Sequence, residues 1–505
     1  MRWQSLLVLL ACSWPARAFA GGLEIPDNGT QALGRGAAFT AKADDGTALE
    51  YNVAGFAQQR GTRVLVDSNL WFSSYSFQRA GAYPDDPTNP LTPWGGKAFP
   101  SVSDQGGAFL APFAAVSSDF GVFERWTFAL GVFGPSSVGN RTYPYSLGFA
   151  PSPARYDIVQ NKAFVAYPTV AAAVHALPWL DVGLAVHLVY ANIDLQTTSL
   201  ADAVGQGTGA GQCANVEYQP CDARTHLETS GVGVTGSAGL LAHATKNVVV
   251  GLAFRGPAEL DTSGNVITQA PRITPNAGFQ PSPATFTFKL PAVARIGARY
   301  VFLDGDREAG DVEIDATYEA WGAAQGDGPH VHVPQITATN PPPGVDLTNI
   351  DFVTPHHYSD SWSLRVGGAY NLPLGHRHDG KYREILSLRA GSYYDAPSSD
   401  PDYTRLDFDT LAKVAGTVGA GLELPSVTFD VALAEIFDVD RTVMAGELRP
   451  VNGAAHGAST DPAGAVYPAV NSGTYSGHSH LLSFGVVVKL DDLFRKQPPA
   501  EPPPP

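Results

Sequence analysis

Long stretches of the chain alternate apolar and polar residues with a period of two. In the clearest stretch, residues 311–320, odd positions carry four carboxylates and a threonine: Asp311, Glu313, Asp315, Thr317 and Glu319 alternate with Val312, Ile314, Ala316 and Tyr318. A helix would spread these carboxylates around most of its surface, whereas a strand places all of them on one face. The pattern therefore predicts a β-strand with one apolar and one acidic face.

About fourteen segments show this alternation. They lie near residues 62–78, 106–118, 123–137, 157–175, 179–197, 227–243, 247–260, 283–302, 310–324, 358–371, 382–395, 407–424, 426–441 and 477–490. Short connections (177–178, 245–246 and 424–426) alternate with long polar ones (198–224, 261–281, 325–355 and 444–476). Short turns at one end and long loops at the other are typical of an outer-membrane barrel, in which an even number of strands places both chain ends on the same side.

No segment after residue 20 approaches the roughly 18 consecutive apolar residues that a membrane-spanning helix requires. A membrane protein with this sequence must then be a closed barrel, because only helices and closed barrels satisfy every backbone group in lipid. A soluble β-sandwich or propeller also alternates, but rarely sets charged faces behind apolar ones over so many long strands. We therefore predict an all-β fold, a transmembrane antiparallel β-barrel over residues 61–490.

The two ends of the chain have their own composition. Residues 1–20 have the features of a signal peptide, with Arg2, an apolar run and the cleavage site Ala18-Phe19-Ala20 before Gly21. A lipoprotein signal ending at Cys12 is the alternative, and either one exports the protein. Residues 491–505 form a proline-rich tail that we expect to be extended and solvated.

Composition and charge agree with an exported barrel. Only 16% of the residues are charged, while glycine (53 residues) and aromatic residues (10%) are abundant. The net charge of −16 argues against nucleic acid as a partner. Cys213 and Cys221 remain once Cys12 is removed, and in an oxidising compartment we expect them to form a disulfide that closes an exposed surface loop. A zinc site is the alternative, but further ligands at suitable spacing are missing from the sequence.

Residues 21–60 are rich in glycine and alanine and poor in strand-forming residues, which suits a compact segment packed inside something larger. Their order resembles the N-terminal hatch of the FadL/TodX family of outer-membrane transporters, at Leu33-Gly34-Arg35, Asp44-Asp45-Gly46-Thr47 and Tyr51-Asn52-Val53-Ala54-Gly55. Val53 departs from the family, which usually has proline there. The resemblance continues through 126–135, 155–156, 167–171, 289–291, 318–321 and 393–397.

This resemblance implies a fourteen-stranded barrel whose lumen holds the hatch. The hatch residues it implicates are Leu33, Gly34, Arg35, Asp44, Asp45, Asn52 and Ala54. It also implies an inward kink of the third strand that opens a lateral gap in the wall, here at Phe133, Gly134 and Pro135. Proline lacks the N–H of a ladder bond and glycine tolerates the bend, so the pair suits such a break. The alternative is that the strand ends there and Pro135 begins a loop.

Charged residues on neighbouring strands predict a ladder across the lumen wall. The carboxylates of 311–319 share that face with Arg365 and Arg389, and we expect the network to rigidify the wall and contact the hatch. Arg365 and Arg389 are also the candidates to bind a fatty-acid carboxylate.

No catalytic motif, cofactor motif or metal motif is evident, so we expect a protein that is not an enzyme and binds no metal or cofactor. Two adjacent residues on a strand face opposite sides, which separates His356 from His357. His478 and His480 share a face, but their position at the expected end of a loop favours solvated histidines over a metal site. His330 and His332 lie in an expected loop as well.

We predict passive uptake of a hydrophobic small molecule, most specifically a long-chain fatty acid, across the outer membrane of a Gram-negative bacterium. The resemblance implies capture by the loops, movement of the hatch and lateral release through the gap. We expect a monomer whose partners are the hydrophobic substrate and outer-membrane lipid. The alternative is a surface barrel that does not transport, such as an adhesin. A hydrophilic porin is disfavoured by a hatch that fills the lumen.

Overall fold

The structure is a computed structural model. It describes residues 28–85, 92–135, 140–200, 213, 215–273, 276–340, 347–375, 383–408, 410–450 and 468–491. The expected signal peptide and almost all of the expected tail lie outside these residues.

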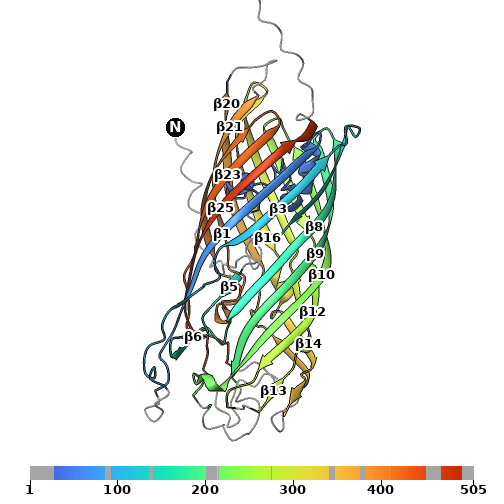
Figure 1. The fold of residues 1–505 in the computed structure, drawn as a ribbon. Helices are drawn as coiled ribbons and strands as arrows, with labels where there is room; N and C mark the ends of the chain where they lie inside the picture. Colours follow the sequence, from blue (N-terminus) through green and yellow to red (C-terminus); the bar gives the residue numbers. More distant parts are fainter. Residues whose placement is uncertain are drawn as a thin grey trace, which may run out of the picture.

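The chain forms a closed antiparallel barrel of 14 wall strands, as predicted (Figure 1). The barrel closes because β1 pairs with β3 on one side and with β25 on the other. The wall strands are β1 (Arg63–Arg79), β3 (Phe109–Ser118), β4 (Trp126–Phe133) continued by β5 (Asn140–Thr142), β8 (Gln160–Leu177), β9 (Leu180–Leu200), β10 (Asp222–His243), β11 (Val248–Arg255) continued by β12 (Ala258–Gln269), β14 (Ser282–Leu290) continued by β15 (Val293–Asp304), β16 (Arg307–Glu319), β20 (Ser361–Leu374), β21 (Glu384–Asp395), β22 (Lys413–Glu423), β23 (Val427–Asp438) and β25 (Gly473–Lys489).

Shorter elements lie in the connections and inside the barrel. The short strands are β2 (Val102–Ser103), β6 (Ser146–Leu147), β7 (Ala150–Pro151), β13 (Gly278–Phe279), β17 (His330–Gln335), β18 (Ala338–Thr339), β19 (Thr348–Val353) and β24 (Arg441–Val443). The helices are α1 (Thr30–Leu33), α2 (Ala48–Tyr51), α3 (Trp321–Gln325) and the 3₁₀ turns η1 (Val53–Gln58), η3 (Gln219–Cys221) and η4 (Pro401–Tyr403). None of the helices among the described residues has the length and apolar character needed to cross a membrane.

Side chains alternate across the wall as the sequence pattern requires. On β9, Leu184 and Val186 are 62% and 54% exposed and point outward, whereas Ala185 and His187 are 6% and 1% exposed and point inward. The outer face is apolar on most strands, which is the surface that a bilayer requires. The lumen face carries small, polar and charged residues.

Three parts of the predicted strand pattern are wrong. The strand expected at 310–324 ends at Glu319, because the chain turns into α3, whose Trp321 is fully buried and donates from Nε1 to the Glu319 carboxylate (2.7 Å). The loop expected at 261–281 begins as the second half of β12. The loop expected at 325–355 contains β17 and β19, which extend the wall from β14.

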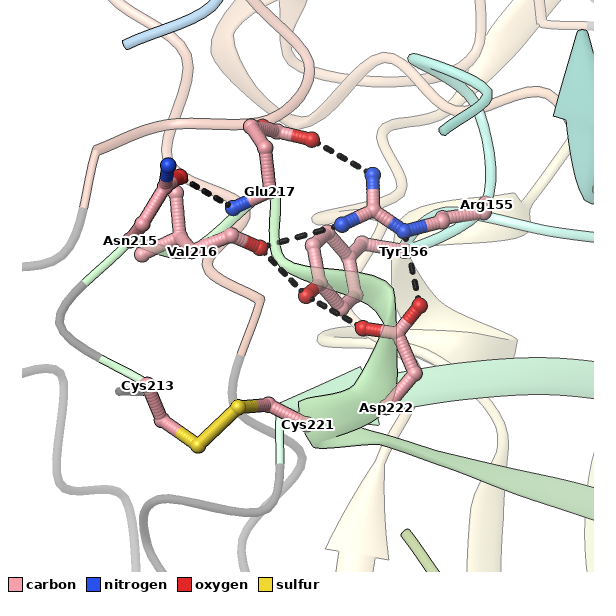
Figure 2. Close-up of a disulfide and its surroundings, with 8 residues drawn as sticks. All are labelled: Arg155, Tyr156, Cys213, Asn215, Val216, Glu217, Cys221 and Asp222. Carbon is pink, nitrogen blue, oxygen red and sulfur yellow. Dashed lines mark hydrogen bonds and ion pairs between the residues drawn. A yellow bond between two sulfur atoms is a disulfide. The ribbon is translucent and has the colours of Figure 1, made fainter. Parts of the chain in front are cut away.

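The long connections gather at one end of the barrel (Figure 1), and one of them carries the expected disulfide (Figure 2). Cys213 and Cys221 form a disulfide, but the two residues are 1% and 0% exposed, so the expected exposure is wrong. The reason is packing, because Tyr156 and Leu448 from other connections and Leu200 at the end of β9 cover the pair. The bridge therefore lies within a folded layer over the barrel mouth, called the cap below, which contains Arg79, Tyr156, Cys213, Cys221 and Leu448.

Candidate functional site

Residues 28–59, called the hatch below, lie inside the barrel near its short-turn end (Figure 1). The hatch contains α1, α2 and η1, and most of its side chains are buried. Tight turns make it compact: Gly36 has φ +68°, and Ala37 and Ala43 also have positive φ. Because these helices are very short, the hatch depends on contacts with the wall for its position.

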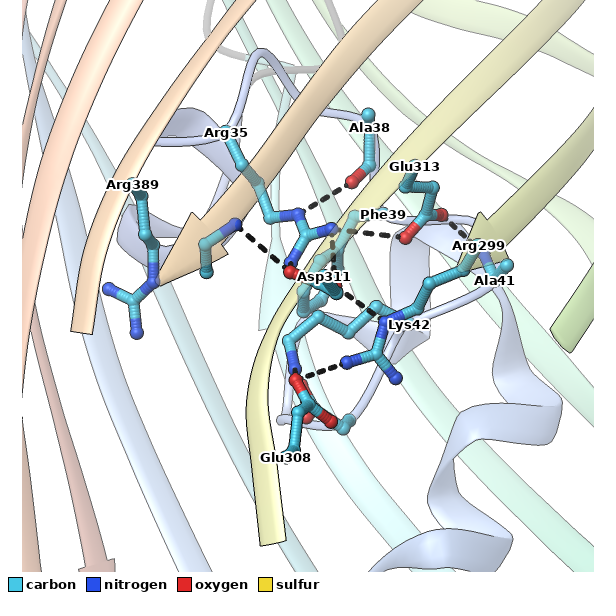
Figure 3. Close-up of polar contacts among 12 residues, drawn as sticks. Arg35, Ala38, Phe39, Ala41, Lys42, Arg299, Glu308, Asp311, Glu313 and Arg389 are labelled. Atoms are coloured by element: carbon cyan, nitrogen blue, oxygen red, sulfur yellow. Dashed lines mark hydrogen bonds and ion pairs between the residues drawn. The ribbon is translucent and has the colours of Figure 1, made fainter. Parts of the chain in front are cut away.

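Arg35 provides the most extensively bonded of these contacts (Figure 3). Its guanidinium donates to both oxygens of Asp311 (3.2 and 2.7 Å) and to Glu313 (3.3 Å), and its Nε donates to the carbonyl of Ala38 (2.9 Å). The side chains of Arg35, Asp311 and Glu313 are all 0% exposed. A bidentate pair of this kind is both strong and geometrically specific.

The next carboxylates of β16 accept bonds from the hatch backbone. Asp315 accepts from the N–H groups of Phe39 and Thr40, each at 2.8 Å, and Glu313 accepts from the N–H of Ala41 (2.6 Å). The acidic face predicted for this strand is therefore the surface on which the hatch rests.

A second wall region binds the start of α1. Thr30 donates from its backbone N–H (2.7 Å) and from its hydroxyl (2.6 Å) to Asp67 on β1. The same hydroxyl lies 2.7 Å from that of Ser483 on β25. Thr30 thus contacts both the first and the last strand of the barrel.

Lumen-facing glycines of the wall make room for the backbone of the hatch at Arg35. A Cβ built on Gly367 would lie 1.8 Å from the carbonyl oxygen of Arg35, and one built on Gly391 would lie 2.3 Å from the carbonyl carbon of Arg35. Both glycines occur where β20 and β21 pass the hatch, paired with each other in register. Any other residue at either position would displace the hatch.

The remaining hatch residues expected from the sequence contact the wall or other parts of the hatch. Asn52 donates to the carbonyls of Thr40 (2.8 Å) and Leu240 (3.1 Å), and its side-chain oxygen accepts from Ala54 N–H at the start of η1 (3.2 Å). Leu33 packs with Trp71 and Tyr393 of the wall, and Gly34 faces Gly419.

Asp44 and Asp45 lie at the polar edge of the hatch. Both carboxylates accept from the side-chain amide of Gln31 (2.9 and 3.0 Å), and Asp44 also pairs with Lys42 (2.8 Å). A polar cavity of about 270 Å³ adjoins them at the short-turn end.

The ladder of the third wall strand is interrupted at Gly134. β4 pairs with β8 from Trp126 to Phe133, and β5 resumes the pairing with β8 at Asn140. On the other side, β4 pairs only with residues 114–118 of β3, so among the described residues Phe109–Phe113 pair with β1 but with no part of β4. The sequence interpretation in which Pro135 begins a loop and the one in which the strand kinks both fit this break.

The hatch contacts the interruption directly. Asn28 donates from Nδ2 to the carbonyl of Gly134 (2.8 Å) and to Glu50 (2.9 Å), and Tyr51 donates to the carbonyl of Asn28 (3.0 Å). A Cβ at Gly134 would lie 2.2 Å from the carbonyl oxygen of Val165 on β8, so the backbone takes this path only with glycine.

An aromatic stack lines the lumen beside the interruption. The ring of Phe133 stacks on those of Phe113 (5.3 Å) and Tyr167 (5.1 Å), and His187 meets Phe133 edge-on at 6.0 Å. All four side chains are buried. The inner side of the break is therefore apolar and close-packed.

Arg365 and Arg389 face the lumen as expected, and each is paired with a carboxylate of the wall. Arg365 donates to Asp395 (2.7 Å), and Arg389 donates to Asp430 (2.5 Å). Arg389 also donates to the side-chain oxygen of Gln31 in the hatch (3.2 Å). A substrate carboxylate would have to replace these partners.

The cap over the mouth is held by buried ion pairs (Figure 2). Arg155 donates to Glu217 (2.5 Å) and Asp222 (2.9 Å), and Arg79 donates to Glu217 (2.7 Å). Burial acts to raise the pKa of Glu217, but the two guanidinium groups outweigh it, so its pKa lies below the usual value. Glu217 is thus a fixed anion that joins three connections.

Two details of the histidine positions differ from the sequence interpretation: β25 begins before His478 and His480, and His356 is buried. His478 and His480 lie within β25 and face outward, with Glu435 of β23 beside them. His356 is fully buried and lies 3.0 Å from Asp407. Both differences depend on cross-strand or long-range neighbours that local sequence does not reveal.

Sequence reasoning missed several contact residues of the site: Asn28, Thr30, Asp67, Phe113 and Ser483. Asp67 carries a detectable signal, because it is a lone carboxylate in the lumen phase of the first strand. The others are ordinary polar or aromatic residues whose contacts arise from strand register.

Comparisons with known proteins agree on one family. Over residues 10–460 the chain matches the family model described as outer membrane protein transport protein (OMPP1/FadL/TodX). A FadL homologue of Pseudomonas aeruginosa superposes with a TM-score of 0.67 at 15% identity, over 93% of this chain and 100% of that chain. A search of curated proteins found no match.

Two solved toluene transporters have a similar fold. TbuX of Ralstonia pickettii superposes with a TM-score of 0.57 at 17% identity, over 90% of this chain and 97% of that one. TodX of Pseudomonas putida gives 0.59 at 15% identity, over 93% and 98%.

Proposed function

Because the chain belongs to the OMPP1/FadL/TodX family of outer-membrane transport proteins, we propose that it carries hydrophobic small molecules passively across the outer membrane of a Gram-negative bacterium. Long-chain fatty acids are its proposed principal substrates, and the protein acts as a monomer.

The observation that carries the proposal is the contact between the hatch and the interrupted strand. Asn28 of the hatch bonds to the carbonyl of Gly134, where the β4 ladder ends. A plug that touches the weakest part of the wall can transmit its own displacement to that part. A barrel that only displays loops has no use for this coupling.

In the proposed pathway, substrate enters among the long loops and reaches the apolar lumen beside Phe133. Displacement of the hatch then opens the wall at Gly134 and Pro135, and the substrate leaves sideways into the membrane. A concentration gradient drives the movement.

A fatty-acid carboxylate has a proposed partner in Arg389. This guanidinium already bonds to Asp430 and, through Gln31, to the hatch. A substrate carboxylate that took over Arg389 would release Gln31, and binding would loosen the hatch. Arg365 is the second candidate, although its bond to Asp395 has no comparable link to the hatch.

Monoaromatic hydrocarbons are the second candidate substrates. TbuX and TodX are toluene transporters by name, and the stack of Phe113, Phe133 and Tyr167 offers aromatic faces beside the proposed exit. An uncharged ligand would not need Arg389.

Uptake assays on cells that express the protein test both parts of the proposal. We expect faster uptake of radiolabelled oleate than in cells without the protein, and toluene measured alongside identifies the substrate class. The double variant Gly134→Thr/Pro135→Val cannot keep the present backbone path, because the new Cβ would meet the carbonyl of Val165 at 2.2 Å. We expect it to reduce uptake at an unchanged surface level.

The matched control is Val132→Thr, which changes an outward side chain of the same strand and leaves its ladder intact. Uptake by the double variant at the parental rate would show that substrate passes straight through the barrel. Absence of uptake by the parent protein for both substrates would favour the adhesin alternative.

A further inference from the structure

Three side chains with metal-binding groups meet on the outer face of the barrel. His480 Nδ1 lies 2.7 Å from Oε2 of Glu435, and His478 Nε2 lies 3.4 Å from the same oxygen. Their ligand atoms all lie within 4.8 Å of one another. We propose that Glu435, His478 and His480 form a binding site for a zinc-type divalent cation.

Strand geometry preorganises the site. His478 and His480 are two residues apart on β25 and therefore share a face. Glu435 on β23 is the register partner of His480, while Phe437 is the partner of His478. Directly opposed side chains on paired strands have Cβ atoms only about 5 Å apart. All three ligands are thus fixed by two hydrogen-bonded strands rather than by a loop.

The surroundings orient the ligands. The ring of Phe437 stacks on His478 (5.1 Å, 22° between planes), and the rings of His478 and His480 meet edge to face (4.2 Å). Stacking limits rotation of His478 and leaves its Nε2 directed toward Glu435. The ligands themselves are accessible, because Glu435 and His480 are each 53% exposed and His478 is 37% exposed.

The donor set selects the class of cation. Two imidazole nitrogens and one carboxylate form the ligand set of many zinc sites, with ligand distances of about 2.0–2.2 Å. Zinc at such distances holds ligand atoms about 3.3 Å apart. The 3.4 Å between His478 and Glu435 is already close to this value, and the 2.7 Å between His480 and Glu435 would have to open slightly. Magnesium and calcium prefer oxygen donors, so the site should discriminate against them. Three protein ligands also leave a coordination position open.

The position of the site suggests where that open position points. On β23 and β25 the outward residues toward the short-turn end are apolar, including Leu433 and Phe484, which are 52% and 55% exposed. The three ligands lie closer to the long-loop end of these strands than Leu433 and Phe484, and the outward-facing Phe437, 54% exposed, lies beyond Glu435 on β23. The site therefore faces away from the lumen, on the opposite side of the wall from the hatch.

A second cluster provides an internal comparison. Asp194, His226 and Glu228 also lie on the outer face, with His226 2.9 Å from Asp194 and 3.4 Å from Glu228. This cluster has one nitrogen donor and two carboxylates, and zinc generally binds more weakly when carboxylates replace imidazoles. We therefore expect the higher affinity at Glu435, His478 and His480.

Calorimetric titration of zinc chloride into the full chain in detergent, purified without a polyhistidine tag, tests the proposal. We expect one tighter equivalent that His480→Gln weakens at least about tenfold, since loss of even a supporting partner costs 10–100-fold in affinity. Glu435→Gln should weaken it too. The matched control His332→Gln removes an exposed histidine that pairs with a single carboxylate, Asp351, and should leave affinity unchanged.

Three other outcomes of the titration would overturn the proposal. Zinc affinity that survives His480→Gln, or that falls instead in His226→Gln, would place the binding elsewhere. Displacement of zinc by a tenfold excess of magnesium would indicate nonspecific charge attraction. Because the substituted side chains are exposed, circular dichroism and the heat-dependent electrophoretic shift of folded barrels should confirm that each variant folds.

Discussion

Replacing Arg35 with methionine should loosen the hatch without unfolding the barrel. Removing one partner of a buried ion pair costs about 3–5 kcal/mol. The two carboxylates that lose Arg35 each keep another partner. Asp311 keeps its ion pair with Arg299, and Glu313 keeps its hydrogen bond from the N–H of Ala41. The lower end of the range, about 3 kcal/mol, is therefore the appropriate value. It corresponds to a rise of about 100-fold in the population of displaced hatch.

Hydrogen exchange measures this population at three known amides. The N–H groups of Phe39, Thr40 and Ala41 donate to Asp315 and Glu313 when the hatch is seated and become free when it moves. We expect their exchange in Arg35→Met to be about 100-fold faster than in the parent, the same factor as the rise in displaced hatch. Amides of the wall strands should keep their parental rates.

The matched control is Arg307→Met. Arg307 is a partly buried cation near the same end of the lumen, and its described partners are Asp304 and the carbonyl of Asn371, both in the wall. Thr30→Ala serves as a milder variant should Arg35→Met fail to fold, with an expected effect of about 1 kcal/mol for a lost hydrogen bond. Parental exchange rates at all three hatch amides in both variants would refute the assignment of Arg35 and Thr30 as anchors.

Three further predictions concern the cap and the wall. Cys213 and Cys221 should resist an impermeant thiol reagent even when reductant is present, until mild denaturant opens the cap; labelling of the native, unreduced protein would contradict the bridge. Because the pKa of Glu217 is lowered in the folded cap, its stabilising contribution is complete above its ordinary value of 4.5 and is lost as the pH falls through the lowered value. Protease cleavage of the cap should therefore rise at low pH, and Glu217→Gln should abolish that pH dependence; an unchanged profile would exclude this group. Asn28→Ala removes the bond to the Gly134 carbonyl and, at about 1 kcal/mol, should change the initial rate of uptake about fivefold; a parental rate would mean that hatch and wall are not coupled through this bond.

The strands of the barrel could be predicted because each depends on a pattern that is local in sequence. The alternation in residues 311–319 specifies a strand with an acidic face wherever its partners lie. Alternation does not predict the structure after Trp321, because the glycine and alanines that follow it mark neither an apolar face nor a polar face. There the chain turns inward because the indole is buried and bonds to Glu319.

The site itself could be predicted only in outline. The residues indicated which carboxylates face the lumen, and the family resemblance indicated that Arg35 belongs to the hatch. They did not indicate that Arg35 meets Asp311, because the contact joins residues 276 positions apart and depends on the register of every intervening strand. The contact of Glu435 with His478 and His480 was not predicted for the same reason, although the sequence shows that the two histidines share a face.

The bonds of Thr30 have a consequence for assembly of the protein. One hydroxyl lies against Asp67 on the first strand and Ser483 on the last, and those two strands form the seam at which the barrel closes. The plug therefore cannot complete its docking until the seam has formed, however early its own residues are synthesised. A docked hatch is then a sign that the barrel has closed. In a folding intermediate whose first and last strands are not yet paired, the hatch cannot be fully bound to the wall.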